Sequence, residues 1–245
     1  MHLLSLTLAL TLLASPQTPE PEPYRVTLIR AAPGDLLELI DLLESRMPVY
    51  DAAGEERPIV LRHRQGDQWD LFVLTPIGSL ASYFSEERTA HHAAAAQAVG
   101  ISEAAYEQGI RDLTSWRQDL FVEGPPAELV RAVIDAGSFF HVEMFIALPG
   151  MFEELVHERR MENAYNAALG RPQPMIFTRL MGAEWDVFTL AVYRDLAHYA
   201  EGDAIAPEEA EAAARSVGFE GREYIGSYMR TLILEHRDTL MGRAM

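Results

Sequence analysis

The spacing of apolar residues along the chain predicts alternating strands and helices. Tyr24, Val26 and Leu28 alternate with more polar neighbours, which is typical of a strand with one buried face. From residue 36 to residue 47, apolar side chains recur at helical spacing. Pro33 precedes them, at a point where a helix tolerates a residue without an N–H. This segment therefore predicts a strand followed by a helix.

A β-hairpin and three further elements are expected next. Residues 59–64 and 69–74 predict two strands, joined by the tight-turn sequence Gln65-Gly66-Asp67. Beyond the hairpin we expect two helices and a last strand, at residues 79–84, 86–98 and 116–122. The order strand–helix–strand–strand–helix–strand is the split βαβ arrangement of a ferredoxin-like module.

The whole pattern occurs twice. Residues 24–84 align with residues 140–200 at a constant offset of 116, and 17 of the 61 aligned positions are identical. Chance would give about four identities at ordinary composition. Identical pairs include Trp69-Asp70 with Trp185-Asp186. The chain is therefore a tandem duplication.

The duplication defines the expected domains. We predict a first module at residues 24–124, a linker helix at residues 125–137 and a second module at residues 138–245. Trp116-Arg117 aligns loosely with His236-Arg237, which places the last strand of the second copy near residues 235–241.

Two such modules resemble the dimeric α+β barrel superfamily, in which two ferredoxin-like sheets pack face to face. The resemblance rests on topology and duplication and covers nearly all of residues 24–245. It implies an α+β fold in which the two tandem modules pack as an intramolecular dimeric α+β barrel, with a pocket between each sheet and its helices. That superfamily includes cofactor-free monooxygenases, haem enzymes and small-molecule binders, so the resemblance does not fix a function.

The N-terminus predicts export to the periplasm or the exterior. Residues 3–14 are almost entirely apolar, and a helix of that length spans about 18 Å, too short for a bilayer core of about 30 Å. We therefore expect a signal peptide at residues 1–15. Residues 16–23 contain four prolines and predict an extended tether.

Composition excludes several classes of function. The chain has no cysteine, which rules out cysteine-ligated metal centres and thiol catalysis. Its formal net charge of −17 argues against nucleic acid and anionic membranes as partners. Because the two copies can pair with each other, we expect a monomer.

The second copy carries the most distinctive polar residues. His141 and Glu143 project from the same face of its first strand, and His236 lies on the last strand, which pairs with the first in a ferredoxin-like sheet. These three residues could bind a divalent metal, act in acid–base catalysis without metal, or form a histidine–carboxylate hydrogen bond in a polar cavity.

Other candidates have simpler structural explanations. Trp69 and Trp185 either wall a ligand pocket or pack beneath the hairpin, with the following aspartates bonding turn N–H groups. Residues 157–160 (His-Glu-Arg-Arg) predict an exposed helix surface. His91 and His92 are neighbours on a helix, about 100° apart, and do not predict a shared metal site.

Three functions remain open from the sequence. The first is binding of a small molecule in an apolar cavity of one or both modules, with His141 and Glu143 supplying polarity. The second is an oxidoreductase, cofactor-free or using haem or metal, with its site in the second module. The third is a structural module that contacts another exported protein. No cofactor is specified by any motif in the sequence.

Overall fold

The computed structural model describes residues 20–201 and 205–245. The predicted signal peptide and most of the predicted tether lie outside these residues. The tether was predicted to end at Pro23, but the first strand already begins at Glu22, and Pro23 pairs with Glu123. Proline is tolerated there because it lies at the start of a strand.

The first module follows the predicted order with two additional helices, because the first predicted helix is followed by a separate helix α2 and a helix α5 precedes the last strand. Its elements are β1 (Glu22–Ala31), α1 (Leu36–Ser45), α2 (Met47–Ala52), β2 (Ile59–Gln65), β3 (Leu71–Pro76), α3 (Leu80–Tyr83), α4 (Glu86–Ala98), α5 (Glu103–Asp112) and β4 (Thr114–Gly124). The sequence analysis did not predict α5. The linker helix is α6 (Ala127–Asp135).

The second module repeats the arrangement. Its elements are β5 (Phe139–Ala147), α7 (Phe152–Ala168), β6 (Met175–Gly182), β7 (Val187–Tyr193), α8 (Leu196–Ala200), α9 (Pro207–Ser216), the 3₁₀ helix η2 (Arg222–Tyr224), α10 (Ile225–Arg230) and β8 (Ile233–Arg243). The single helix α7 replaces the pair α1 and α2. The first helix is broken near Pro48, where Ala164 stands in the second module. Proline lacks an N–H and disrupts a helix interior.

The eight strands close into one antiparallel barrel. Their order is β1-β3-β2-β8-β5-β7-β6-β4, so each module contributes a four-stranded half. The halves join at two seams, β2 with β8 and β4 with β6. In the first module, Ile29 of β1 lies opposite Arg117 of β4. In the second module, Phe145 of β5 lies opposite His236 of β8.

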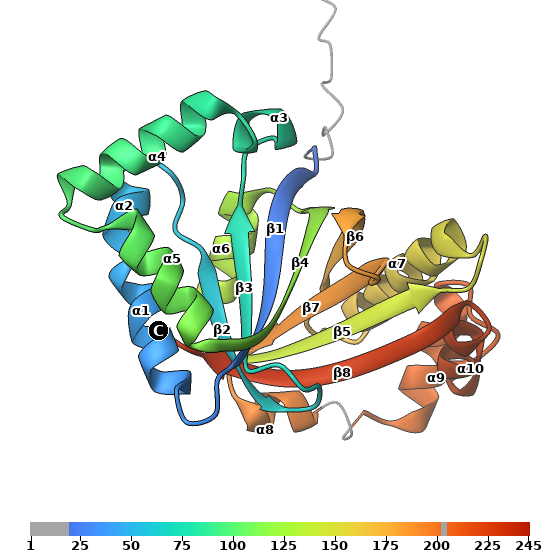
Figure 1. The fold of residues 1–245 in the computed structure, drawn as a ribbon. Helices are drawn as coiled ribbons and strands as arrows, with labels where there is room; N and C mark the ends of the chain where they lie inside the picture. The colour runs from blue at the N-terminus through green and yellow to red at the C-terminus, as the bar shows by residue number, and fades with distance from the viewer. Residues whose placement is uncertain (1–19, 202–204) are drawn as a thin grey trace, which may run out of the picture.

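Apolar side chains fill the inside of the barrel, and helices cover the outside. The interior cluster draws on both modules and includes Tyr24, Phe72, Phe140, Phe177 and Phe188, all at most 1% exposed. Outside it, α1 and α2 pack on the first half-sheet and α7 and α10 on the second (Figure 1). Within the described residues, no helix has the length and apolarity needed to cross a membrane.

Candidate functional site

The polar residues predicted on the first and last strands of the second module lie together. Glu143 Oε1 is 3.5 Å from His236 Nε2, and Glu143 Oε2 is 3.8 Å from Arg159 on α7, so the group faces the helices. The structure adds Asp238, which stands opposite Glu143 in the register of β5 and β8. The site is therefore larger than the three predicted residues.

Two carboxylates contact the two imidazoles. His141 Nε2 lies 2.9 Å from Asp238 Oδ1, and His236 Nε2 lies 3.5 Å from Asp238 Oδ2. Burial acts to raise the pKa of Glu143, but the nearby His236 and Arg159 outweigh it and lower this pKa to about 2. Glu143 is therefore an anion at neutral pH.

The predicted exposure of residues 157–160 is wrong for Glu158 and Arg159. Glu158 is 0% exposed and Arg159 3% exposed, and two nitrogens of Arg159 donate to the Glu158 carboxylate at 2.6 and 2.8 Å. Arg159 also contacts Glu162 at 2.6 Å. Burial raises the pKa of Glu158, and it raises that of Glu162 to about 7. This part of α7 packs against the sheet through paired charges.

The two predicted tryptophans lie on the other side of the sheet. Trp69 and Trp185 are 1% and 2% exposed and belong to the barrel core, apart from His141 and Glu143. Asp70 and Asp186 do not bond the hairpin turns as expected. Each accepts a hydrogen bond from the last residue of a neighbouring strand instead. The N–H of Ala31, at the end of β1, donates to Asp70 at 2.9 Å, and the N–H of Ala147, at the end of β5, donates to Asp186 at 2.9 Å.

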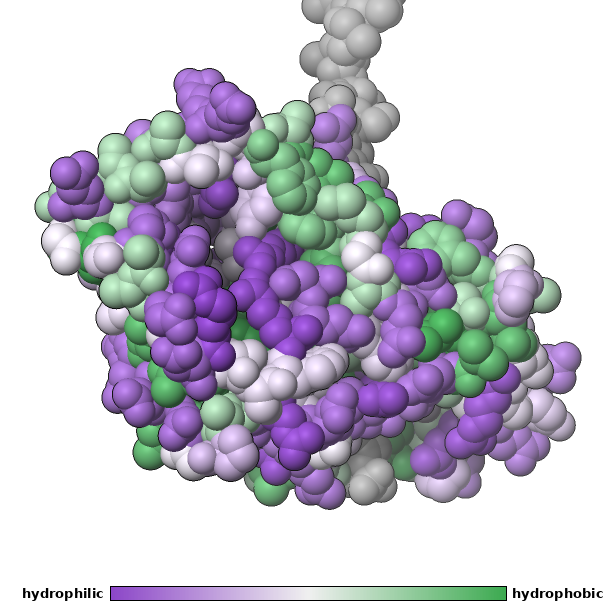
Figure 2. Space-filling view, in the orientation of Figure 1, coloured by the Kyte–Doolittle hydropathy of each residue, from purple (hydrophilic) through white to green (hydrophobic). Residues whose placement is uncertain are grey.

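A cavity of about 400 Å³ lies between the sheet and the helices of the first module. Figure 2 shows a hollow bordered by hydrophilic residues in the region where Figure 1 places α4 and α5. Its apolar lining includes Ile29, Leu43, Met47, Val60 and Val73. Its polar lining includes Arg25, Arg46, Arg88, Arg117, His92, Tyr50, Tyr83 and Tyr106. A pocket between sheet and helices was expected, but this one is strongly polar.

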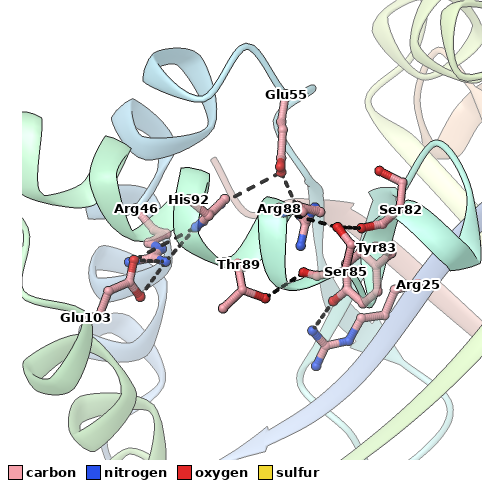
Figure 3. A network of polar contacts seen from close by, with 10 residues as sticks. All are labelled: Arg25, Arg46, Glu55, Ser82, Tyr83, Ser85, Arg88, Thr89, His92 and Glu103. Carbon is pink, nitrogen blue, oxygen red and sulfur yellow. Dashed lines mark hydrogen bonds and ion pairs between the residues drawn. The ribbon is translucent and has the colours of Figure 1, made fainter.

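Arg46 and His92 each have a buried nitrogen that makes no hydrogen bond within the described residues, although His92 Nε2 lies 3.8 Å from Glu55 Oε2. Arg46 Nη2 donates to both oxygens of Glu103 at 2.6 and 2.7 Å and contacts His92 Nδ1 at 3.1 Å (Figure 3). A guanidinium can only donate, so Nδ1 accepts and the ring hydrogen is on Nε2. Burial lowers the pKa of His92, which keeps the ring neutral at neutral pH. Arg46 Nη1 and His92 Nε2 make no hydrogen bond within the described residues.

The other three arginines are held by acidic and aromatic side chains. Asp119 contacts Arg25 at 2.9 Å and Arg117 at 2.9 Å. Arg25 Nη1 donates to the Tyr83 hydroxyl at 2.8 Å. The Arg88 guanidinium lies 4.4 Å from the centre of the Tyr83 ring and pairs with Glu55 at 2.6 Å (Figure 3). These contacts fix the arginines around the cavity.

The duplicated sites differ in their balance of charge. Four arginines of the first cavity lie close to four carboxylates, Glu107 in the lining and Asp119, Glu103 and Glu55 in ion pairs. In the second module four carboxylates, Glu143, Glu158, Glu162 and Asp238, surround the single cation Arg159. The strand register makes Arg117 equivalent to His236 and Asp119 equivalent to Asp238. The sequence alignment, which had placed Trp116 opposite His236, was therefore wrong by one residue.

Sequence reasoning missed the first cavity. Its arginines come from β1, from the end of α1, from α4 and from β4, so no local motif unites them. The sequence predicted only that His91 and His92 do not share a metal, and it gave no sign that the His92 side chain is as little as 14% exposed. A usable signal was the difference between equivalent positions of the two copies, Arg25 against His141 and Arg46 against Glu162.

Comparison with known proteins supports the fold. No family model and no curated protein matches the chain. A proposed monooxygenase from Lactobacillus acidophilus is 10% identical, with 92% of this chain and 95% of that chain covered and a TM-score of 0.52. A proposed monooxygenase from Fusobacterium nucleatum is 9% identical, with 94% of each chain covered and a TM-score of 0.56. An anthrone oxidase-like protein is 11% identical, with 91% of this chain and 92% of that chain covered and a TM-score of 0.53.

These likenesses, at about one-tenth identity, establish architecture alone. The structure and its neighbours define the chain as a dimeric α+β barrel whose two halves belong to one polypeptide. This confirms the predicted fold class and the predicted superfamily resemblance.

Proposed function

We propose that the cavity of the first module binds a small organic anion with an apolar or aromatic body. The observation that carries this proposal is the pair of buried nitrogens, Arg46 Nη1 and His92 Nε2, which make no hydrogen bond within the described residues and belong to side chains that line the cavity. The nearest carboxylate oxygen to His92 Nε2 is that of Glu55, at 3.8 Å, beyond hydrogen-bonding distance. A buried N–H without an acceptor costs about 1–3 kcal/mol. A carboxylate or phenolate oxygen that came within hydrogen-bonding distance would remove that cost.

The lining of the cavity supports one anionic group on an apolar scaffold. Its four arginines lie close to four carboxylates, but Arg46 Nη1 makes no hydrogen bond within the described residues and remains able to donate to an anionic oxygen. Burial raises the pKa of Tyr50, so its hydroxyl stays protonated and can donate. The apolar side chains of Ile29, Val60 and Val73 offer a surface for a hydrocarbon body. A volume of about 400 Å³ lies within the usual range for small-molecule sites.

Titration with 1-naphthoate and with its neutral analogue 1-naphthalenemethanol tests the proposal. We expect one 1-naphthoate per chain, bound at least about 10-fold more tightly than the alcohol, because a hydrogen bond to a charged group contributes about 1.5–3 kcal/mol. By the same reasoning, the variant Arg46→Gln should bind 1-naphthoate about 10-fold to 100-fold more weakly.

Arg215→Gln is the matched control, because it also removes an arginine from an ion pair but lies on α9 of the second module. Its affinity for 1-naphthoate should match that of the wild type within twofold. Equal binding of acid and alcohol, or equal loss in both variants, would contradict the proposal.

Oxidation of the bound molecule is a second candidate function. The N–H donors of Arg46 and His92 would stabilise an enolate or phenolate formed by loss of a proton. Three structural neighbours are described as monooxygenases or as anthrone oxidase-like. Conversion of a CH₂ group to a carbonyl by O₂ releases one water and needs no external reductant. Oxygen uptake with anthrone, lost in Arg46→Gln, would support this candidate, and absence of uptake would leave binding alone.

We also propose that the protein acts after export. The support is the apolar stretch at residues 3–14 followed by the proline-rich residues 16–23. Mass spectrometry of the protein from cell fractions should find it outside the cytoplasm with an N-terminus near residue 16. An intact N-terminus on cytoplasmic protein would contradict export.

A further inference from the structure

We propose that Glu143, His236 and Asp238 bind a divalent transition-metal ion in the second module. This site is separate from the anion cavity of the first module and does not depend on it. The two carboxylates and one imidazole come from the paired strands β5 and β8, which hold them in a fixed register. Imidazole and carboxylate are suitable ligands for Zn²⁺ and Mn²⁺.

The spacing of three atoms matches a coordination sphere. Glu143 Oε1, His236 Nε2 and Asp238 Oδ2 offer one ligand atom each, and the three residues can place such atoms within 4.8 Å of one another. His236 Nε2 is 3.5 Å from both carboxylate oxygens. Bonds of about 2.1 Å in a tetrahedral site place neighbouring ligand atoms about 3.4 Å apart. The two separations from His236 Nε2 already match this value, and the two carboxylate oxygens need at most a small movement from their separation of no more than 4.8 Å.

One of the atoms that would bind the metal has no hydrogen-bond partner. His236 Nε2 is buried and makes no hydrogen bond within the described residues. The second oxygen of Glu143 accepts from Thr189 at 2.9 Å, and that of Asp238 contacts His141 at 2.9 Å. The His236 ring stacks on Phe145 with centroids 4.6 Å apart. Outer contacts of this kind orient the ligands of metal sites.

The local charge favours a cation. Glu143 and Asp238 supply two carboxylates, and Arg159, which lies 3.8 Å from Glu143, is itself paired with Glu158 and Glu162. A divalent ion would be attracted by the two carboxylates of the site. Asp238 is 55% exposed, so the ion can enter from solvent and keep a water ligand.

The first module provides an internal comparison. The positions equivalent to Glu143, His236 and Asp238 carry Thr27, Arg117 and Asp119. Arg117 has no lone pair to donate to a metal, and its guanidinium pairs with Asp119. The ligand set therefore exists in one copy of the duplicated site.

The test is titration of the full chain, stripped with a chelator, with Zn²⁺ and separately with Mn²⁺, followed by calorimetry. We expect one ion per chain. His236→Gln and Glu143→Gln should each weaken binding about 100-fold or more. His141→Gln should weaken it about 10-fold, the size of effect expected for a group that orients a ligand. Circular dichroism and thermal melting establish that each variant is folded.

His91→Gln is the control variant, because His91 is exposed on α4 in the other module. It should bind the ion as the wild type does. No binding of either ion by the wild type, or unchanged affinity in His236→Gln, would overturn the proposal.

Discussion

Arg46 and Glu162 occupy equivalent positions in the two modules but carry opposite charge. The residues that pair with them differ as well. Arg46 pairs with Glu103 on a helix that the second module replaces with η2 and α10. Glu162 pairs instead with Arg159, whose equivalent in the first module is Leu43. The charges at equivalent positions of this helix therefore differ between the modules, although both modules repeat the same arrangement of strands.

The buried pair of Glu158 and Arg159 should respond asymmetrically to mutation. Arg159→Leu leaves the fully buried Glu158 without its partner, so we expect a loss of about 3–5 kcal/mol in the free energy of unfolding. The double variant Glu158→Leu/Arg159→Leu restores the Leu42-Leu43 pair of the first module and should lose clearly less. Urea unfolding measures both.

The exposed neighbour Arg160 supplies the control for this comparison. Arg160→Gln should change the free energy of unfolding by less than about 0.5 kcal/mol. If the double variant is less stable than the single one, the pair stabilises the fold by more than its desolvation costs, contrary to our account.

Glu162 should make stability fall as the pH rises from 4.5 to 7. Its pKa is about 7 in the folded protein and 4.5 as the ordinary value, so the folded state binds more protons than the unfolded state in that window. The effect is at most about 1.4 kcal/mol per pH unit for one group. Urea unfolding with chelator present should show Glu162→Gln gaining stability relative to the wild type across this window. A difference in free energy of unfolding between Glu162→Gln and the wild type that stays constant from pH 4.5 to 7 would contradict the raised pKa of Glu162.

At the scale of elements, two glycines allow the modules to join. Gly66 follows β2 with φ of 129°, and a Cβ there would lie 2.2 Å from the Asp238 carbonyl oxygen on β8. Gly182 ends β6 with φ of 107°, and a Cβ there would lie 2.8 Å from the Asp119 carbonyl oxygen on β4. Both seams of the barrel therefore require close backbone approach, which explains why both copies carry this glycine.

Gly66→Ala should destabilise the protein far more than Gly54→Ala. Gly54 also has positive φ, 62°, but nothing lies within 4 Å of the position that a Cβ would occupy there, so the cost is about 1–2 kcal/mol of backbone strain. Gly66→Ala adds a clash across the seam, and we expect a loss of about 3 kcal/mol or more. Equal unfolding midpoints for the two variants would show that the seam tolerates a side chain.

The sequence predicted most elements because periodicity and duplication agreed. Helix α4 was predicted with its observed bounds, and the hairpin and both last strands within a few residues. The helix α5 was missed because its apolar face is sparse and no residue of it is buried. The alignment of the last strands was wrong by one residue, because register is set by pairing with β1 and β5, which identity between copies does not report.

At the scale of the whole molecule, duplication produced two equivalent positions between sheet and helices. His141, Glu143 and His236 could be predicted to meet because they lie on strands that the fold pairs. The first cavity could not be predicted, because Arg46 and His92 meet only through the packing of α4 against α2. We account for the asymmetry by a division of roles, with an anion in the first module and a cation in the second.

A crystal structure of the full chain grown with 1-naphthoate and Zn²⁺ tests this division most directly. The account predicts the naphthoate carboxylate within hydrogen-bonding distance of Arg46 Nη1 and His92 Nε2. It also predicts zinc about 2.0–2.2 Å from ligand atoms of Glu143, His236 and Asp238. Naphthoate bound at the equivalent place in the second module, or zinc bound among the arginines of the first, would contradict it.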